Sequence, residues 1–88
     1  MTRAEVLAWL DTRRPLPPAR LRERLRTAVR DAPDELPAHL ARHGRELLDA
    51  VAAHPEGGRE LALDLLAADA FATYAFEAQA EEGKDAVE

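Results

Sequence analysis

Apolar residues recur at helical spacing in four segments of the chain, which are separated by short stretches that contain proline or glycine. We predict helices over residues 3–12, 18–30, 35–53 and 58–82. Leu21, Leu25 and Val29 show the pattern, because residues four apart lie on the same side of a helix. The spacing and the breaks predict an all-α fold, namely a small four-helix bundle that is mostly antiparallel and has a long C-terminal helix.

The first segment begins with a sequence that caps helices. Thr2 stands three residues before Glu5, the spacing of a capping box, in which each side chain accepts a hydrogen bond from the backbone amide of the other residue. A helix of about three turns still needs tertiary packing to persist. We therefore expect Trp9, at the edge of the apolar stripe, to anchor this helix.

The third predicted helix carries a glycine within its apolar face. Five residues are predicted to be buried on this face: Leu36, Leu40, Leu47, Leu48 and Val51. Gly44 lies in the same arc, where the missing side chain would let a neighbouring helix approach closely. The alternative is that Gly44 only costs helix propensity, by about 1 kcal/mol. We favour the close approach.

The last segment differs from the others because it is apolar on two sides. No glycine or proline interrupts residues 59–82. One face consists of Leu61, Leu65, Ala68, Ala72 and Phe76, and the other of Leu63, Leu66, Ala70 and Tyr74. By the helical angle of 100° per residue the two faces lie about 160° apart. Such a helix is either central in its own fold or shared with another chain, and three short helices offer little to surround it.

A homodimer through the C-terminal helix is therefore expected. A chain of 88 residues buries only about 60–65% of its unfolded surface, so further burial by self-association is favourable. We predict a dimer interface formed by Leu63, Leu66, Ala70 and Tyr74. Gly83 is expected to end a single helical domain, residues 1–82, and to leave residues 83–88 as an acidic, disordered tail.

Two aspartates interrupt the apolar stretch of the last helix. Asp69 stands four residues before Thr73, and we predict both side chains to be buried. Because a buried carboxylate is costly unless it is paired, Asp64 and Asp69 are expected to contact arginine or threonine. The candidate donors are Arg20, Arg22, Arg24 and Arg26. The alternative is a carboxylate that titrates unusually or binds a cation.

Charge is unevenly distributed along the chain. Eight arginines and three acidic residues give residues 1–30 a net charge of +5, whereas four basic and fourteen acidic residues give residues 31–88 a net charge of −10. Arginines concentrate in a basic patch on the second helix: Arg20, Arg22, Arg24, Arg26 and Arg30. Attraction between the two halves explains this distribution. Nucleic-acid binding by the patch is the alternative function, less favoured because the pI is about 5.2.

Two histidines one turn apart offer a second candidate for metal binding. His39 and His43 project to the same side of the third helix, with Glu46 nearby, and two imidazoles with a carboxylate can hold a divalent ion. Leu40 occupies the position where a metalloprotease helix has glutamate, so that motif is absent. We favour polar residues at the border of the core, and we predict no cofactor.

Composition excludes several classes of protein. The chain has no cysteine, no glycine-rich phosphate loop and no recognisable catalytic constellation, so we do not expect an enzyme. It has no signal-peptide pattern and no apolar run long enough to span a membrane. The arginine-rich usage is typical of bacteria with GC-rich genomes. We expect a cytoplasmic helical interaction protein, an adaptor or regulatory subunit that forms a homodimer and binds a protein partner.

Overall fold

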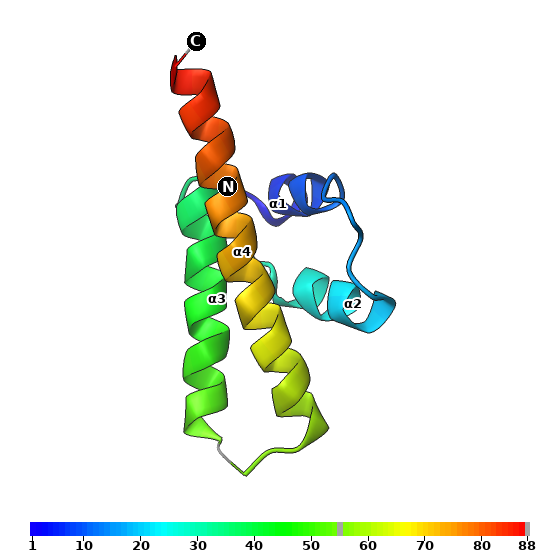
Figure 1. Cartoon of the computed structure of the whole chain (residues 1–88). Coiled ribbons are helices and arrows are strands. Elements are labelled where there is room, and N and C mark those ends of the chain that lie inside the picture. Colours follow the sequence, from blue (N-terminus) through cyan, green and yellow to red (C-terminus); the bar gives the residue numbers. More distant parts are fainter. Residues whose placement is uncertain (55, 88) are drawn as a thin grey trace.

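The chain folds into a long helical hairpin with two short helices on one side of it (Figure 1). The helices are α1 (Arg3–Leu10), α2 (Ala19–Ala28), α3 (Leu36–Ala53) and α4 (Arg59–Val87). The computed structural model describes residues 1–54 and 56–87, with side chains described as far as residue 83. Over these residues the regular structure is entirely helical, as the sequence predicts.

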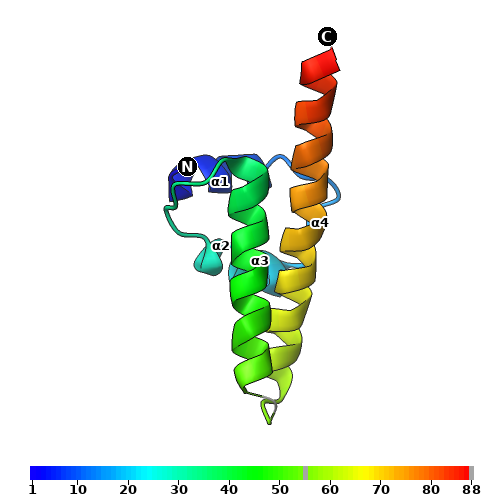
Figure 2. The same cartoon turned by 90° about the vertical axis from the view of Figure 1, so that its left-hand side faces the viewer.

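The hairpin of α3 and α4 determines the shape of the molecule. These two helices run antiparallel and make the most extensive interface in the fold. Figure 2 shows α3 and α4 toward the viewer, with α1 and α2 behind them. The antiparallel packing expected of a bundle is therefore present in the hairpin, whereas α1 and α2 run across one of its faces. We call the covered side the closed face and the opposite side the open face.

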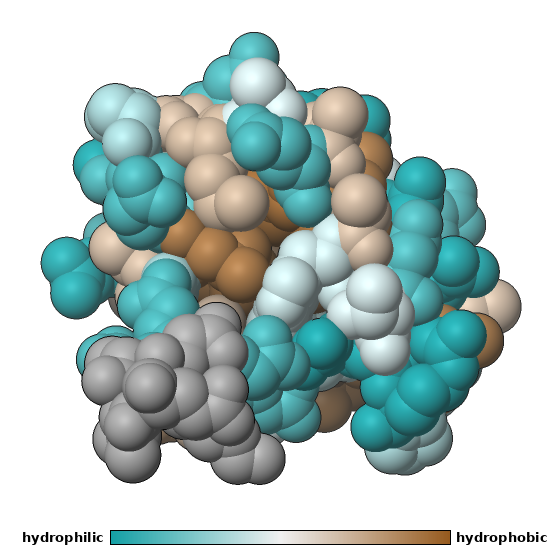
Figure 3. Space-filling view, turned by 90° about the horizontal axis from the view of Figure 1, so that it is seen from above, coloured by the Kyte–Doolittle hydropathy of each residue, from teal (hydrophilic) through white to brown (hydrophobic). Residues whose placement is uncertain are grey.

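The core lies between the closed face and the two short helices. Its buried apolar residues come from all four segments: Val6, Leu7, Leu10, Leu25, Val29, Leu40, Leu47, Ala67, Ala68, Phe71 and Ala78. In the view from above, hydrophobic residues are visible toward the middle of the molecule and hydrophilic residues around much of its edge (Figure 3). Phe71 is the largest of the fully buried residues, so α4 supplies the largest side chain of the core.

Gly44 allows α3 and α4 to approach closely, as predicted. A Cβ atom at this position would lie 3.2 Å from the backbone oxygen of Ala68 and 3.3 Å from the Cβ of Phe71. Both distances are tighter than ordinary van der Waals contact. A larger residue at position 44 would therefore force α3 and α4 apart or shift their side chains.

The N-terminal segment is held by its cap and by the connection between α2 and α3. The side chains of Thr2 and Glu5 form the predicted capping box. The Ala32 N–H donates to the Met1 carbonyl over 3.1 Å, which joins the start of the chain to that connection. Trp9 anchors α1 as expected: its ring lies 6.1 Å from that of Tyr74, and its Nε1–H donates to Glu81 over 3.2 Å.

The end of α4 differs from the prediction. The helix continues through Gly83 to Val87, so Gly83 does not end it as expected, and Glu88 lies outside the described residues. One glycine costs a helix only about 1 kcal/mol, and the neighbouring glutamate, lysine and alanine residues favour helix. A single weak residue therefore does not end a helix that is already formed on both sides.

Candidate interaction surface

The face of α4 that was predicted to form a dimer is largely occupied within the chain. Ala70 and Tyr74 pack against the core, and Leu63 is half-buried. Of the four predicted interface residues only Leu66 is exposed, at 57%. The other three are partly buried because α1 and α2 pack on this side of the helix, with Trp9 against Tyr74.

Large apolar side chains are exposed on the open face instead. The exposed fractions are 50% for Leu48, 49% for Leu65, 57% for Leu66 and 78% for Phe76. Leu48 was predicted to be buried on α3, and the adjacent Leu47 is. Neighbouring residues lie about 100° apart on a helix, so two adjacent leucines can lie on different sides of it, as these two do.

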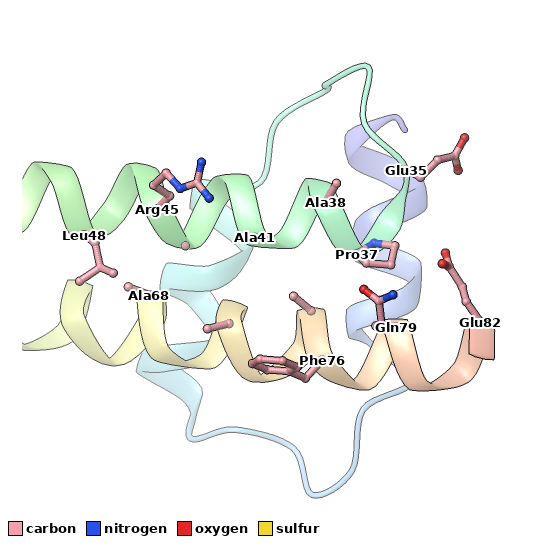
Figure 4. Close-up of a pocket in the computed structure, with 13 residues that line it drawn as sticks. Glu35, Pro37, Ala38, Ala41, Arg45, Leu48, Ala68, Phe76, Gln79 and Glu82 are labelled. Carbon is pink, nitrogen blue, oxygen red and sulfur yellow. The ribbon is translucent and has the colours of Figure 1, made fainter. Parts of the chain in front are cut away.

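These side chains border two grooves that adjoin along the hairpin. One groove has a volume of about 610 Å³ and extends from Pro37 and Glu82 to Leu48, and the other, of about 620 Å³, extends from Leu48 to Ala62. They share Leu48, Ala68 and Ala72. In Figure 4, Leu48 projects from α3 and Phe76 from α4 into the first groove. The open face is thus one continuous apolar surface built by both long helices.

Two charged residues of opposite sign lie in the middle of the open face. Arg45 lines the first groove and Asp69 the second, and both are exposed. Asp69 and Thr73 were predicted to be buried, which is wrong in the folded chain, because at 100° per residue both lie on the side of α4 opposite the buried Phe71. Among the ion pairs of the described side chains, neither Arg45 nor Asp69 takes part.

Asp64 makes the arginine contact that was expected of the aspartates in α4. Its Oδ1 lies 2.5 Å from Nε of Arg24, and the side chains are only 20% and 28% exposed. This ion pair joins α2 to α4 on the closed face. Of the two aspartates, the one nearer the start of the helix is therefore the structural one.

The arginines of the predicted basic patch are mostly engaged by acidic residues. Arg22 and Arg26 both pair with Asp11, and Arg30 pairs with Glu46, while Arg20 is exposed. The hydrogen bond from Arg22 holds the pKa of the Asp11 carboxyl below its ordinary value. The positive charge of α2 is thus largely balanced where it lies.

His39 and His43 form a buried pair that binds the backbone of one residue. Only 0% and 2% of their surfaces are exposed. Nε2 of His39 lies 2.8 Å from the carbonyl oxygen of Arg30, to which it donates. The Arg30 N–H in turn donates to Nε2 of His43 over 3.2 Å. Because Arg30 follows the end of α2 and has no helical partner for these groups, the pair satisfies both of them. We call this arrangement the histidine clamp.

The clamp requires a neutral His43. His43 accepts through Nε2, so its proton sits on Nδ1, which lies 3.8 Å from Glu46 and has no hydrogen-bond partner. Burial lowers the pKa of His43 below its ordinary value of 6.5, and the neighbouring His39 lowers it further. Each Nε2 is occupied by the backbone, and the described residues hold no group of three or more His, Cys, Asp or Glu placed to bind a metal. Glu46 pairs with Arg30 instead.

Two features of the site were not found from sequence. The spacing of His39 and His43 shows that they share a side of α3, but it does not show that their common partner is a backbone segment from an earlier part of the chain. The exposure of Leu48 had a signal, namely its adjacency to Leu47. That signal was insufficient because either leucine could have been the buried one.

Comparisons with models of protein families, with curated proteins and with solved structures find no match to this chain. None of its described helices combines the length and the apolar character needed to cross a membrane.

Proposed function

We propose that this protein is a small helical interaction module, of the adaptor or regulatory type, that forms a homodimer through the open face of its α3–α4 hairpin. The observation that supports the proposal is the continuous apolar surface with Leu48, Leu65, Leu66 and Phe76 at its edges. Contiguous exposed apolar patches on small proteins mark interaction sites. The C-terminal helix keeps its expected role in the dimer interface, but through the open face and not through the face that α1 and α2 cover.

The energy available from this surface suits a moderate affinity. Fully burying one leucine or phenylalanine side chain contributes about 1.5–3 kcal/mol, so four half-exposed side chains from each of two copies contribute about 10 kcal/mol in all. The loss of translational and rotational freedom on association costs about 4–15 kcal/mol. This cost opposes the gain from the large side chains and the smaller gain from burying the alanines. At the low end of that cost a surplus of about 6 kcal/mol remains, so we expect a dissociation constant of roughly tens of micromolar.

The competing function, nucleic-acid binding by α2, has less support. Counterion release requires arginines that are free to contact phosphates. Arg22, Arg24, Arg26 and Arg30 each lie in an ion pair with an acidic residue of this chain. Binding to a mixed-sequence DNA duplex or single-stranded RNA at about 100 mM salt would reverse the preference between the two functions.

Sedimentation of the wild type and of two matched variants tests the proposal. Leu65→Glu places a charge on the open face, whereas Leu16→Glu makes the same change in the connector between α1 and α2, where Leu16 is 47% exposed against 49% for Leu65. We expect a dimer for the wild type and for Leu16→Glu, and a monomer with unchanged helix content for Leu65→Glu. A wild type that stays monomeric up to about 500 μM would contradict the proposal, since that exceeds the expected dissociation constant by far.

A further inference from the structure

The open face carries a regular seam on each long helix. On α3 the seam residues are Ala38, Ala41, Arg45, Leu48 and Ala52, and on α4 they are Ala62, Leu65, Asp69, Ala72, Phe76 and Gln79. All eleven are exposed. Along both helices the spacing alternates between three and four residues, which is the spacing by which helices pack knobs into holes along a bundle seam. A two-helix hairpin with two such seams presents half of a four-helix bundle.

The close approach at Gly44 determines which seam residues lie at the same height. A Cβ at position 44 would touch Ala68 and Phe71, so position 44 of α3 lies at the same height along the hairpin as residues 68–71 of α4. Both helices rise equally per residue and run in opposite directions. Residues of α3 and α4 whose numbers add to about 114 therefore lie at the same height. The resulting layers pair Ala38 with Phe76, Ala41 with Ala72, Arg45 with Asp69, Leu48 with Leu65 and Ala52 with Ala62. The central layer of the seam therefore contains one positive and one negative charge.

We infer that two copies dock hairpin against hairpin as an intermolecular four-helix bundle, with α3 of each copy opposite α4 of the other and Arg45 paired with Asp69 across the interface. This inference rests on the proposed function and specifies its geometry. The occupant of the open face is a second copy because one chain supplies both halves of each complementary layer. A two-fold axis that runs along the hairpin produces this arrangement.

Charge selects this orientation over the other two-fold arrangement. An axis that runs across the hairpin would place α3 opposite α3 and α4 opposite α4. When centred on the charged layer, that arrangement would set Arg45 against Arg45 and Asp69 against Asp69, and like charges facing each other in an interface are unfavourable. With the axis along the hairpin, the layer contains two opposite-charge pairs and no net charge.

The sizes of the side chains agree with the same orientation. Phe76, the most exposed large apolar residue at 78%, lies opposite Ala38 of the second copy, so a large side chain meets a small one. Leu48 lies opposite Leu65, and the remaining layers are alanine against alanine. Small residues in the layers beside the leucines and phenylalanines allow the helices to approach closely.

Disulfide formation tests the orientation, and the chain suits it because it has no cysteine of its own. We expect a mixture of the Ala41→Cys and Ala72→Cys proteins to form a mixed disulfide at least about tenfold faster than Ala72→Cys links to itself, because a disulfide requires Cα atoms within about 7 Å. Faster self-linking of Ala72→Cys, or no mixed disulfide while the wild type is dimeric, would overturn the inference.

Charge reversal tests the central layer. Arg45→Asp and Asp69→Arg should each raise the dissociation constant of the dimer by about tenfold or more, and an equimolar mixture of the two should form a heterodimer of roughly wild-type affinity. Glu23→Arg, on α2 and away from the open face, is the matched control and should change nothing. If both single reversals leave a dimeric protein unaffected, the inference fails and the proposed function stands. If the wild type is monomeric, both fail.

Discussion

The two faces of the α3–α4 hairpin are built from the same kinds of helix but differ in how their apolar residues are used. The closed face holds Phe71 and the histidine clamp, and polar contacts such as Arg24 with Asp64 fix the short helices to it. The open face holds Phe76 and Leu65 with a single central pair of charged residues, Arg45 and Asp69. The short helices cover the closed face, whereas no segment among the described residues covers the open face.

Polar contacts distinguish the closed face of this hairpin from its open face better than hydrophobicity does. Both faces of α4 are apolar, and hydrophobic patterning alone did not distinguish the side that α1 and α2 cover from the side that they leave exposed. The closed face is marked by side chains that satisfy buried backbone groups and charges, since such groups are costly when left unpaired. Substitutions on the closed face should therefore affect stability more than matched substitutions on the open face.

The two phenylalanines of the chain should differ most. Phe71→Ala removes a fully buried ring from the closed face and should lower the free energy of unfolding by about 3–5 kcal/mol, because it leaves a cavity. Phe76→Ala, at 78% exposure, should change the stability of the monomer by less than about 0.5 kcal/mol. Urea denaturation followed by circular dichroism at low micromolar concentration measures both. Equal losses for the two variants would show that the open face is not separate from the core.

Tyr74 and Leu66 belong to the same predicted face of the last helix, but substitutions at the two positions should differ in their effect on stability. Tyr74→Glu places a carboxylate against Trp9 and beside Glu77 and should cost about 2–4 kcal/mol, whereas Leu66→Glu should leave the stability of the monomer nearly unchanged. Thermal denaturation of dilute samples compares them. A folded Tyr74→Glu protein with wild-type melting temperature would mean that α1 does not cover this residue in solution.

The histidine clamp should make stability depend on pH. Because the pKa of His43 is lowered in the folded chain, the unfolded chain binds the proton more readily, so stability is full above the ordinary value of 6.5 and falls as the pH drops below it. His43→Gln keeps an acceptor for the Arg30 N–H but does not titrate. We expect its stability to fall less than that of the wild type between about pH 7.5 and pH 5.5, a range above the titration of ordinary carboxylates. The groups facing His43 are His39, Glu46 and Arg30.

The ion pair between α2 and α4 should have the smallest effect. Asp64→Asn removes the partner of a partly buried Arg24, and we expect a loss of about 1 kcal/mol or less in the free energy of unfolding. Asp69→Asn, on the open face, is the matched change and should not alter the stability of the monomer. Denaturant titration of both proteins measures the difference, and a larger loss for Asp69→Asn would place that residue in an internal contact.

Local features of the fold were predicted well. The capping box of Thr2 and the close approach at Gly44 are confirmed, because the first depends on neighbouring residues of one helix and the second on the absence of a side chain. Trp9 anchors α1 as expected, although its partners Tyr74 and Glu81 lie on α4. The arginine contact of Asp64 was expected in kind, and only its donor was open. None of these predictions required knowing which helices pack against each other.

The candidate surface was predicted only in part. Exposed apolar residues on α4 were expected, but on the face that α1 and α2 cover in the structure. The partner of His39 and His43, the backbone of Arg30, was not anticipated. The two faces of α4 are similar in composition, so the pattern cannot rank them. Gly83 was given too much weight for the same reason, since a local preference of about 1 kcal/mol does not decide where a long helix ends.

The sequence by itself determined that this chain is all helical, where its breaks fall, and that its last helix is apolar on two sides. The tertiary structure alone decided which side α1 and α2 cover, and hence that Leu48, Leu65 and Phe76 remain exposed around Arg45 and Asp69. The physical reason is that helical periodicity is a local property of neighbouring residues. The choice between two apolar faces depends instead on polar contacts between distant segments, such as the histidine clamp, which form only when those segments meet.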